Sequence, residues 1–70
     1  MSLEFLGKDP DSPNGGSPTI WQDTETGDLW IQGWTVQGLA ARAEIGTIPD
    51  GEAVVRVPRR MLQFFPEGEQ

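Results

Sequence analysis

Residues 19–36 most constrain what this chain can fold into, because their composition predicts a β-hairpin. Two runs rich in β-branched and aromatic residues, 19–22 and 28–36, flank a stretch of turn-forming residues at 23–27. Gly27, at the end of that stretch, can adopt the positive φ that tight hairpin connections require. The segment therefore predicts two antiparallel strands at the centre of the fold.

The register of this hairpin follows from the position of its turn. If the turn centres on residues 25 and 26, Trp21 lies opposite Trp30 and Ile20 lies opposite Ile31. One face of the hairpin then carries indoles and the other carries isoleucines. A single-residue bulge at Gly27 would shift this register.

Three tryptophans in one hairpin region are candidates for both core packing and partner binding. Trp30 and Trp34 share a strand face if the strand is continuous, and Gly33 between them marks either a bulge or a close approach to the backbone. One or two of Trp21, Trp30 and Trp34 are expected in the core, and an indole left partly exposed would serve as a binding anchor. Stacking on single-stranded nucleic acid is less favoured, because aromatic platforms for it normally lie in a basic groove.

The remaining segments complete an α+β fold with a small antiparallel sheet of three or four strands. The expected elements are an edge strand at 3–6, a Pro- and Gly-rich loop at 7–18, a short helix at 37–46, a turn at 49–52, a strand at 53–57, a second short helix at 58–65 and a frayed tail at 66–70. The loop at 7–18 is either a solvated connection or a binding loop.

The segment at 37–46 changes the apolar period from two residues to about 3.6. Val36, Leu39, Ala40 and Ala43 form one narrow apolar stripe, and Gly46 is placed to end the helix. Two helical turns are too few to be stable alone in water, so the helix is expected to pack on the sheet.

Two apolar faces are expected to enclose the core from the C-terminal part of the chain. Alternation places Ala53, Val55 and Val57 on the core face of a strand. Prolines at 58 and 66 bound the last helix, in which Pro58, Met61, Leu62 and Phe65 group on one side, laying Leu62 and Phe65 over the sheet. A strand at 58–65 remains an alternative.

Composition excludes most chemistry. The 70 residues contain no cysteine and no histidine, so zinc sites, disulfides and thiol or imidazole catalysis lose their usual groups. The acidic turn at 23–28 matches a calcium loop only loosely, and the glycines near Lys8 lack the spacing of a phosphate-binding loop. We expect one small domain over 1–70 with no enzymatic activity, catalytic residue, cofactor or metal.

No stretch of the sequence has the basic start and apolar run of a secretory signal, or the length of apolar chain that spans a membrane. The expected location is the cytoplasm, without a membrane partner. The net charge of −6 discourages contact with nucleic acid and favours basic partners.

The bases are concentrated in one spot: Arg56, Arg59 and Arg60 account for three of the five. This spot either recognises an anion on a partner or pairs with acids of the chain itself. The acids available for internal pairing include, for example, Glu4, Glu44 and Glu52.

Four blocks spread over nearly the whole chain form a larger pattern. They are Phe5-Leu6-Gly7-Lys8-Asp9-Pro10, Ser17-Pro18-Thr19-Ile20-Trp21, Gln32-Gly33-Trp34-Thr35-Val36 and Val55-Arg56-Val57-Pro58-Arg59-Arg60-Met61-Leu62. The pattern resembles small, largely uncharacterised actinobacterial proteins of about this length, often encoded beside Xre-type helix-turn-helix regulators. The resemblance implies a small accessory protein of a transcriptional regulator, although the chain itself has no helix-turn-helix pair.

Taken together, these features favour a noncatalytic protein-binding module, with a DNA-binding regulator as the candidate partner. The candidate contact residues are Trp21, Trp30, Trp34, Arg56, Arg59, Arg60, Phe64 and Phe65. Two alternatives stay open. One is direct binding of nucleic acid through the three arginines, and the other is a self-assembling structural module, such as a homodimer joined through a sheet edge or exposed aromatics.

Overall fold

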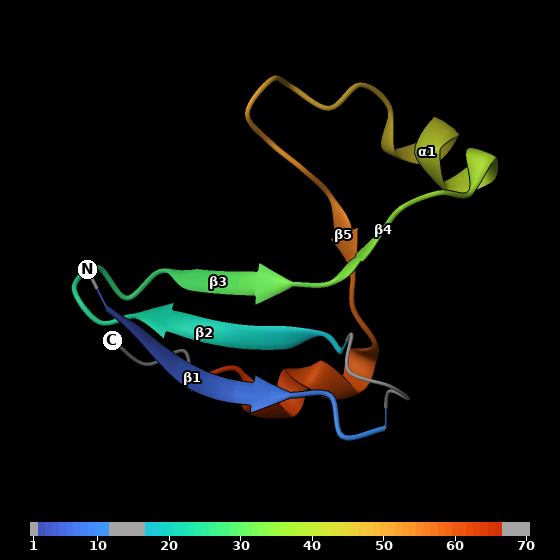
Figure 1. Cartoon of the computed structure of the whole chain (residues 1–70). Coiled ribbons are helices and arrows are strands. Elements are labelled where there is room, and N and C mark those ends of the chain that lie inside the picture. The colour runs from blue at the N-terminus through green and yellow to red at the C-terminus, as the bar shows by residue number, and fades with distance from the viewer. Residues whose placement is uncertain (1, 12–16, 67–70) are drawn as a thin grey trace.

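The computed structural model describes residues 2–11 and 17–66, and it has the α+β architecture that the sequence predicts. A three-stranded antiparallel sheet in the order β1–β2–β3 is accompanied by a separate two-stranded sheet, β4–β5 (Figure 1). The elements are β1 (Leu3–Lys8), β2 (Thr19–Asp23), β3 (Leu29–Gln32), β4 (Trp34–Thr35), α1 (Leu39–Ile45), β5 (Val55–Arg56) and the 3-10 helix η1 (Arg59–Phe64). β1 includes Gly7 and Lys8, which were expected in the loop.

The central hairpin has the predicted register. Trp21 pairs with Trp30 and Ile20 pairs with Ile31 between β2 and β3. The turn is closed by the Gly27 N–H, which donates to the Asp23 carbonyl at 2.9 Å, and Gly27 has a φ of 82°. The turn glycine thus supplies the left-handed backbone that the sequence indicates.

A bulge in β1 determines which side chains of that strand face each side of the sheet. Phe5 pairs with Trp21 and Gly7 pairs with Ile20, so Leu6 is an extra residue between two consecutive pairs. Residues two apart on a regular strand share a face, but the extra residue reverses this alternation. Phe5 therefore lies on the face of Trp21, whereas Gly7 lies on the face of Ile20.

Helix η1 covers the Ile20 face of the sheet. A Cβ at Gly7 would overlap the ring of Phe64, so the ring rests directly on the strand backbone there. Ile20 and Met61 are both fully buried between the sheet and the helix. The small core of the protein lies at this contact.

The helical alternative for the last segment is the one observed, but its period differs from the prediction. A 3-10 helix has three residues per turn, so Met61 and Phe64 share its inner side. The α-helical period wrongly placed Leu62 over the sheet, whereas its side chain is 56% exposed. Phe65 is half-buried at the end of the helix.

The chain leaves the three-stranded sheet at Gly33. A Cβ at this position would lie 2.8 Å from the Arg56 carbonyl oxygen and 2.8 Å from Val57 Cγ1. The close approach that the sequence offered as one role for this glycine is therefore observed. Residues 33–57, which we call the arm, carry β4, α1 and β5 away from the main sheet (Figure 1).

The prediction that the short helix packs on the sheet is wrong. None of the residues of α1 is buried, and Leu39 on its expected apolar stripe is 86% exposed. The helix does end at Gly46, whose φ is 83°. The radius of gyration, 13.7 Å against about 11 Å for a compact chain of this length, reflects the projecting arm.

The expected core strand at 53–57 is also different. Only Val55 and Arg56 form a strand, they pair with β4, and both are exposed, as is Ala53. Val57 is half-buried. β4, the strand that pairs with β5, has only two residues and belongs to a separate sheet, so it does not bury the expected face of Ala53, Val55 and Val57.

The predicted turn at 49–52 is present, with Gly51 at a φ of 87°. Part of the expected loop, 12–16, and most of the expected tail, 67–70, lie outside the described residues. Among the residues that are described, no helix is long and apolar enough to cross a membrane.

Candidate functional site

Three aromatic side chains from three strands form a row across the sheet. Phe5 of β1 pairs with Trp21 of β2, and Trp21 pairs with Trp30 of β3. Side chains directly opposite each other on antiparallel strands lie on one face with Cβ atoms about 5 Å apart. We call Phe5, Trp21 and Trp30 the aromatic row.

The aromatic row lies on the face of the sheet that η1 does not cover. Phe5 is 59% exposed and Trp30 is 46% exposed, while Trp21 between them is half-buried. On the opposite face, the neighbouring row is Gly7, Ile20 and Ile31, which begins under η1. Large apolar side chains in adjacent exposed positions are typical of contact surfaces.

Charge is distributed unevenly along the strands on the face of the aromatic row. In one direction, the next residue of β2 on this face is Asp23, at the start of the acidic turn 23–28. In the other direction, the next row is Lys8 opposite Thr19. The Asp23 carboxylate accepts backbone N–H groups of Glu25 at 2.8 Å and Thr26 at 3.3 Å, which fixes the turn beside the row.

Trp34 is not part of the aromatic row. The break at Gly33 places Trp34 in β4, so the parity that would have put it on the face of Trp30 does not apply. Its partner is Arg56 of β5, whose guanidinium carbon lies 4.8 Å from the centroid of the indole ring. This is a cation–π contact that joins the two strands of the arm.

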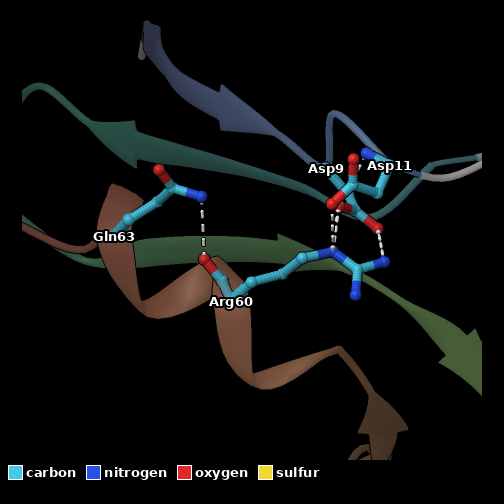
Figure 2. A network of polar contacts seen from close by, with 4 residues as sticks. All are labelled: Asp9, Asp11, Arg60 and Gln63. Carbon is cyan, nitrogen blue, oxygen red and sulfur yellow. Dashed lines mark hydrogen bonds and ion pairs between the residues drawn. The ribbon is translucent and has the colours of Figure 1, made fainter.

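Arg60 of η1 forms a bidentate ion pair with Asp9, the residue after β1 (Figure 2). Its Nε donates to Asp9 Oδ1 at 2.6 Å and its Nη2 donates to Asp9 Oδ2 at 2.8 Å, and Asp11 lies 3.6 Å from the same Nε. The Asp9 side chain is fully buried. The hydrogen bonds that Arg60 donates to Asp9, together with the negative charge of that carboxylate, raise the pKa of Arg60 above the ordinary arginine value.

The expected basic spot therefore does not act as one patch. Arg56 stacks on Trp34 and Arg60 pairs with Asp9, whereas Arg59 is exposed and makes no ion pair with the described residues. Pairing of Arg60 with the protein's own acids is confirmed, but the partner is neither Glu4, Glu44 nor Glu52. The partner, Asp9, lies 51 residues away in sequence, and sequence pattern alone does not show which distant acid reaches η1.

The two phenylalanines expected as an apolar anchor are not equally placed. Phe64 is half-buried, and its ring packs against Gly7 on the face of the sheet that η1 covers. Phe65 helps to line a surface hollow beside η1 with Met61 and Leu62. Phe65 is thus accessible from outside, whereas Phe64 belongs to the packing of the fold.

Phe5 is the member of the aromatic row that sequence reasoning missed. The pattern of Leu3–Leu6 placed it in an edge strand, but only the pairing of β1 with β2 shows that it lies beside Trp21. No group of three or more Asp or Glu side chains that could hold a metal ion occurs within 2–11 and 17–66.

Comparison with known proteins adds no relative to this description. No protein-family model, no curated protein and no solved structure matches the chain.

Proposed function

We propose that this protein is a noncatalytic protein-binding module and that the aromatic row is its contact surface. The observation that carries the proposal is that Phe5 and Trp30 flank Trp21 on the sheet face opposite η1 and are 59% and 46% exposed among the described residues. Indoles in such positions are frequent hot spots of protein interfaces. The net charge of −6 favours a partner with a basic surface.

The class of partner follows from the sequence resemblance. Proteins of the resembled family are often encoded beside Xre-type helix-turn-helix regulators, so we propose such a DNA-binding regulator as the partner. A DNA-binding surface is itself basic, and an acidic module would be attracted to it at a rate that falls with salt.

The experiment compares side chains on the two faces of the three-stranded sheet. Binding of the purified regulator is measured by calorimetry for the unmodified chain, Trp30→Ala, Phe5→Ala and Ile31→Ala. Ile31 is the matched control because it is 41% exposed on the opposite face of β3. We expect Trp30→Ala to weaken binding by about 30-fold, the range of an interface hot spot, and Ile31→Ala to leave it within about twofold.

Two results would contradict the proposal. Equal binding by Trp30→Ala and the unmodified chain would remove the aromatic row as the contact surface. Absence of any binding to the regulator at low salt would remove the regulator as the partner.

Self-assembly is a second candidate, supported by the exposed apolar side chains of the arm. Leu39, Val54 and Val55 are 86%, 40% and 40% exposed, and a second copy could cover them. Light scattering of the concentrated protein tests this candidate, since a monomer mass would exclude it. Direct nucleic-acid binding has less support, because Arg56 and Arg60 already contact Trp34 and Asp9.

A further inference from the structure

The dimensions of the aromatic row match one turn of a polyproline II helix. Adjacent strands lie about 4.8 Å apart, so Phe5 and Trp30, two strands apart, are separated by about 9.6 Å along the row. A polyproline II helix rises about 3.1 Å per residue with three residues per turn, or about 9.3 Å. Residues i and i+3 of such a helix, lying across the strands, would meet the two ends of the row.

The hydrogen-bonding groups of the aromatic row also suit this kind of ligand. An indole N–H can only donate, and neither the Trp21 nor the Trp30 indole donates a hydrogen bond to any described residue. A polyproline II backbone has no internal hydrogen bonds, so its carbonyl groups are free to accept. The row thus combines flat apolar surface for proline rings with donors for the carbonyls between them.

The charge beside the aromatic row indicates the character of the residues that flank those prolines. The turn 23–28, which begins one row beyond Trp21, contains Asp23, Glu25 and Asp28 and no base. On the opposite side of the row from this turn, Lys8 is the one basic side chain of β1 and β2 on the same face. A ligand lying along the row, with arginine or lysine on the side of the acidic turn, would be complementary in charge.

From these three observations we infer that the aromatic row binds an extended, proline-rich segment of basic character in the polyproline II conformation. The inference rests on the proposed protein-binding function and specifies the part of the partner that is recognised. Aromatic-lined grooves recognise such segments because the ligand is already extended and little conformational entropy is lost on binding. A second copy of this chain is disfavoured as the occupant because it would bring its own acidic turn, and the charge of −6, against the first.

The test uses the intact ¹⁵N-labelled protein, in which Trp21, Trp30 and Trp34 give three separate indole N–H signals in an NMR spectrum. The probe is a synthetic peptide of about twelve residues that repeats Pro-Pro-Arg. We expect the Trp21 and Trp30 signals to shift during titration, while the Trp34 signal stays in place because that ring lies in the arm against Arg56. Absence of shifts, or equal shifts of all three signals, would overturn the inference.

Two control peptides separate the contributions of conformation and charge. Replacing each proline by alanine keeps the charge but removes the polyproline II preference, and we expect binding at least about tenfold weaker. Replacing each arginine by glutamate keeps the conformation, and we expect binding to be lost at low salt. An alanine peptide that binds as tightly as the proline peptide would contradict the inference.

The variants used for the regulator distinguish failure of this inference from failure of the proposed function. Trp30→Ala should abolish peptide binding, and Ile31→Ala should preserve it. A regulator that binds through Trp30 although the proline peptide does not would overturn this inference alone. If Trp30→Ala affects neither ligand, both proposals are wrong.

Discussion

The two halves of this molecule differ in how their apolar residues are covered. In the three-stranded sheet, Ile20 and Met61 are fully buried beneath η1, and Arg60 ties that helix to Asp9. In the arm, no residue of α1 is buried and Leu39 is 86% exposed. Stability is therefore concentrated in the sheet and η1, whereas the arm has little packing to hold it in place.

The difference also separates the surface proposed for binding from the region with little packing. The aromatic row lies on the well-supported sheet, so its side chains are positioned before a partner arrives. Preorganised contact residues lose less entropy on binding than residues of a mobile segment. Substitutions that compare equivalent residues of the two regions can test this division.

The largest expected effect is the contrast between Met61→Ala and Leu39→Ala. Met61 is fully buried, so its truncation should lower the free energy of unfolding by about 3 kcal/mol, which is a large part of the total for a domain this small. Leu39→Ala should change the stability by less than about 0.5 kcal/mol. Thermal unfolding followed by circular dichroism measures both, and similar losses would show that α1 packs against the sheet in solution.

A smaller contrast is expected between two glycines, Gly7 and Gly38. A Cβ at Gly7 overlaps the Phe64 ring, so Gly7→Ala should cost about 2 kcal/mol as the helix shifts away from β1. Gly38 has an extended backbone with φ −72°, and a Cβ there meets nothing within 4 Å. Gly38→Ala should be nearly neutral in urea denaturation, and a neutral Gly7→Ala would contradict the close contact of η1 with the sheet.

The smallest contrast is between adjacent arginines of η1. Arg60→Gln should lower the midpoint of thermal unfolding because the buried Asp9 carboxylate loses its bidentate partner, whereas Arg59→Gln should not. Since the pKa of Arg60 is raised in the folded state, its stabilising contribution is complete below the ordinary arginine pKa and is lost only above it. The difference between the two variants should thus persist from pH 7 to about pH 10.

The hairpin could be predicted because its information is local. The turn-forming residues show where the turn is centred, and the number of residues on each side of that centre places Trp21 opposite Trp30, as observed. The apolar stripe of α1 was equally visible in the sequence, but an amphipathic pattern predicts a face without identifying what covers it. In this case nothing among the described residues buries that face.

The parts of the site that escaped prediction depend on contacts between distant segments. Phe5 and Gly7 lie on opposite faces only because Leu6 is an extra residue in β1. The residues around Leu6 carry no sequence pattern that predicts this bulge. The pair of Asp9 and Arg60 spans 51 residues. η1 is a 3-10 helix of six residues with Phe64 against Gly7, a geometry that the α-helical period did not anticipate.

The pairing of Trp34 with Arg56 joins the start of the arm to its end. It brings the two ends of the arm side by side, about 5 Å apart between paired Cα atoms, directly after the chain leaves β3. The arm is thus an insertion whose entry and exit coincide, as in a loop grafted onto a finished domain. Lengthening such an insertion twofold costs only about 0.6 kcal/mol of chain entropy, so its size can vary while the sheet that displays the aromatic row keeps its register.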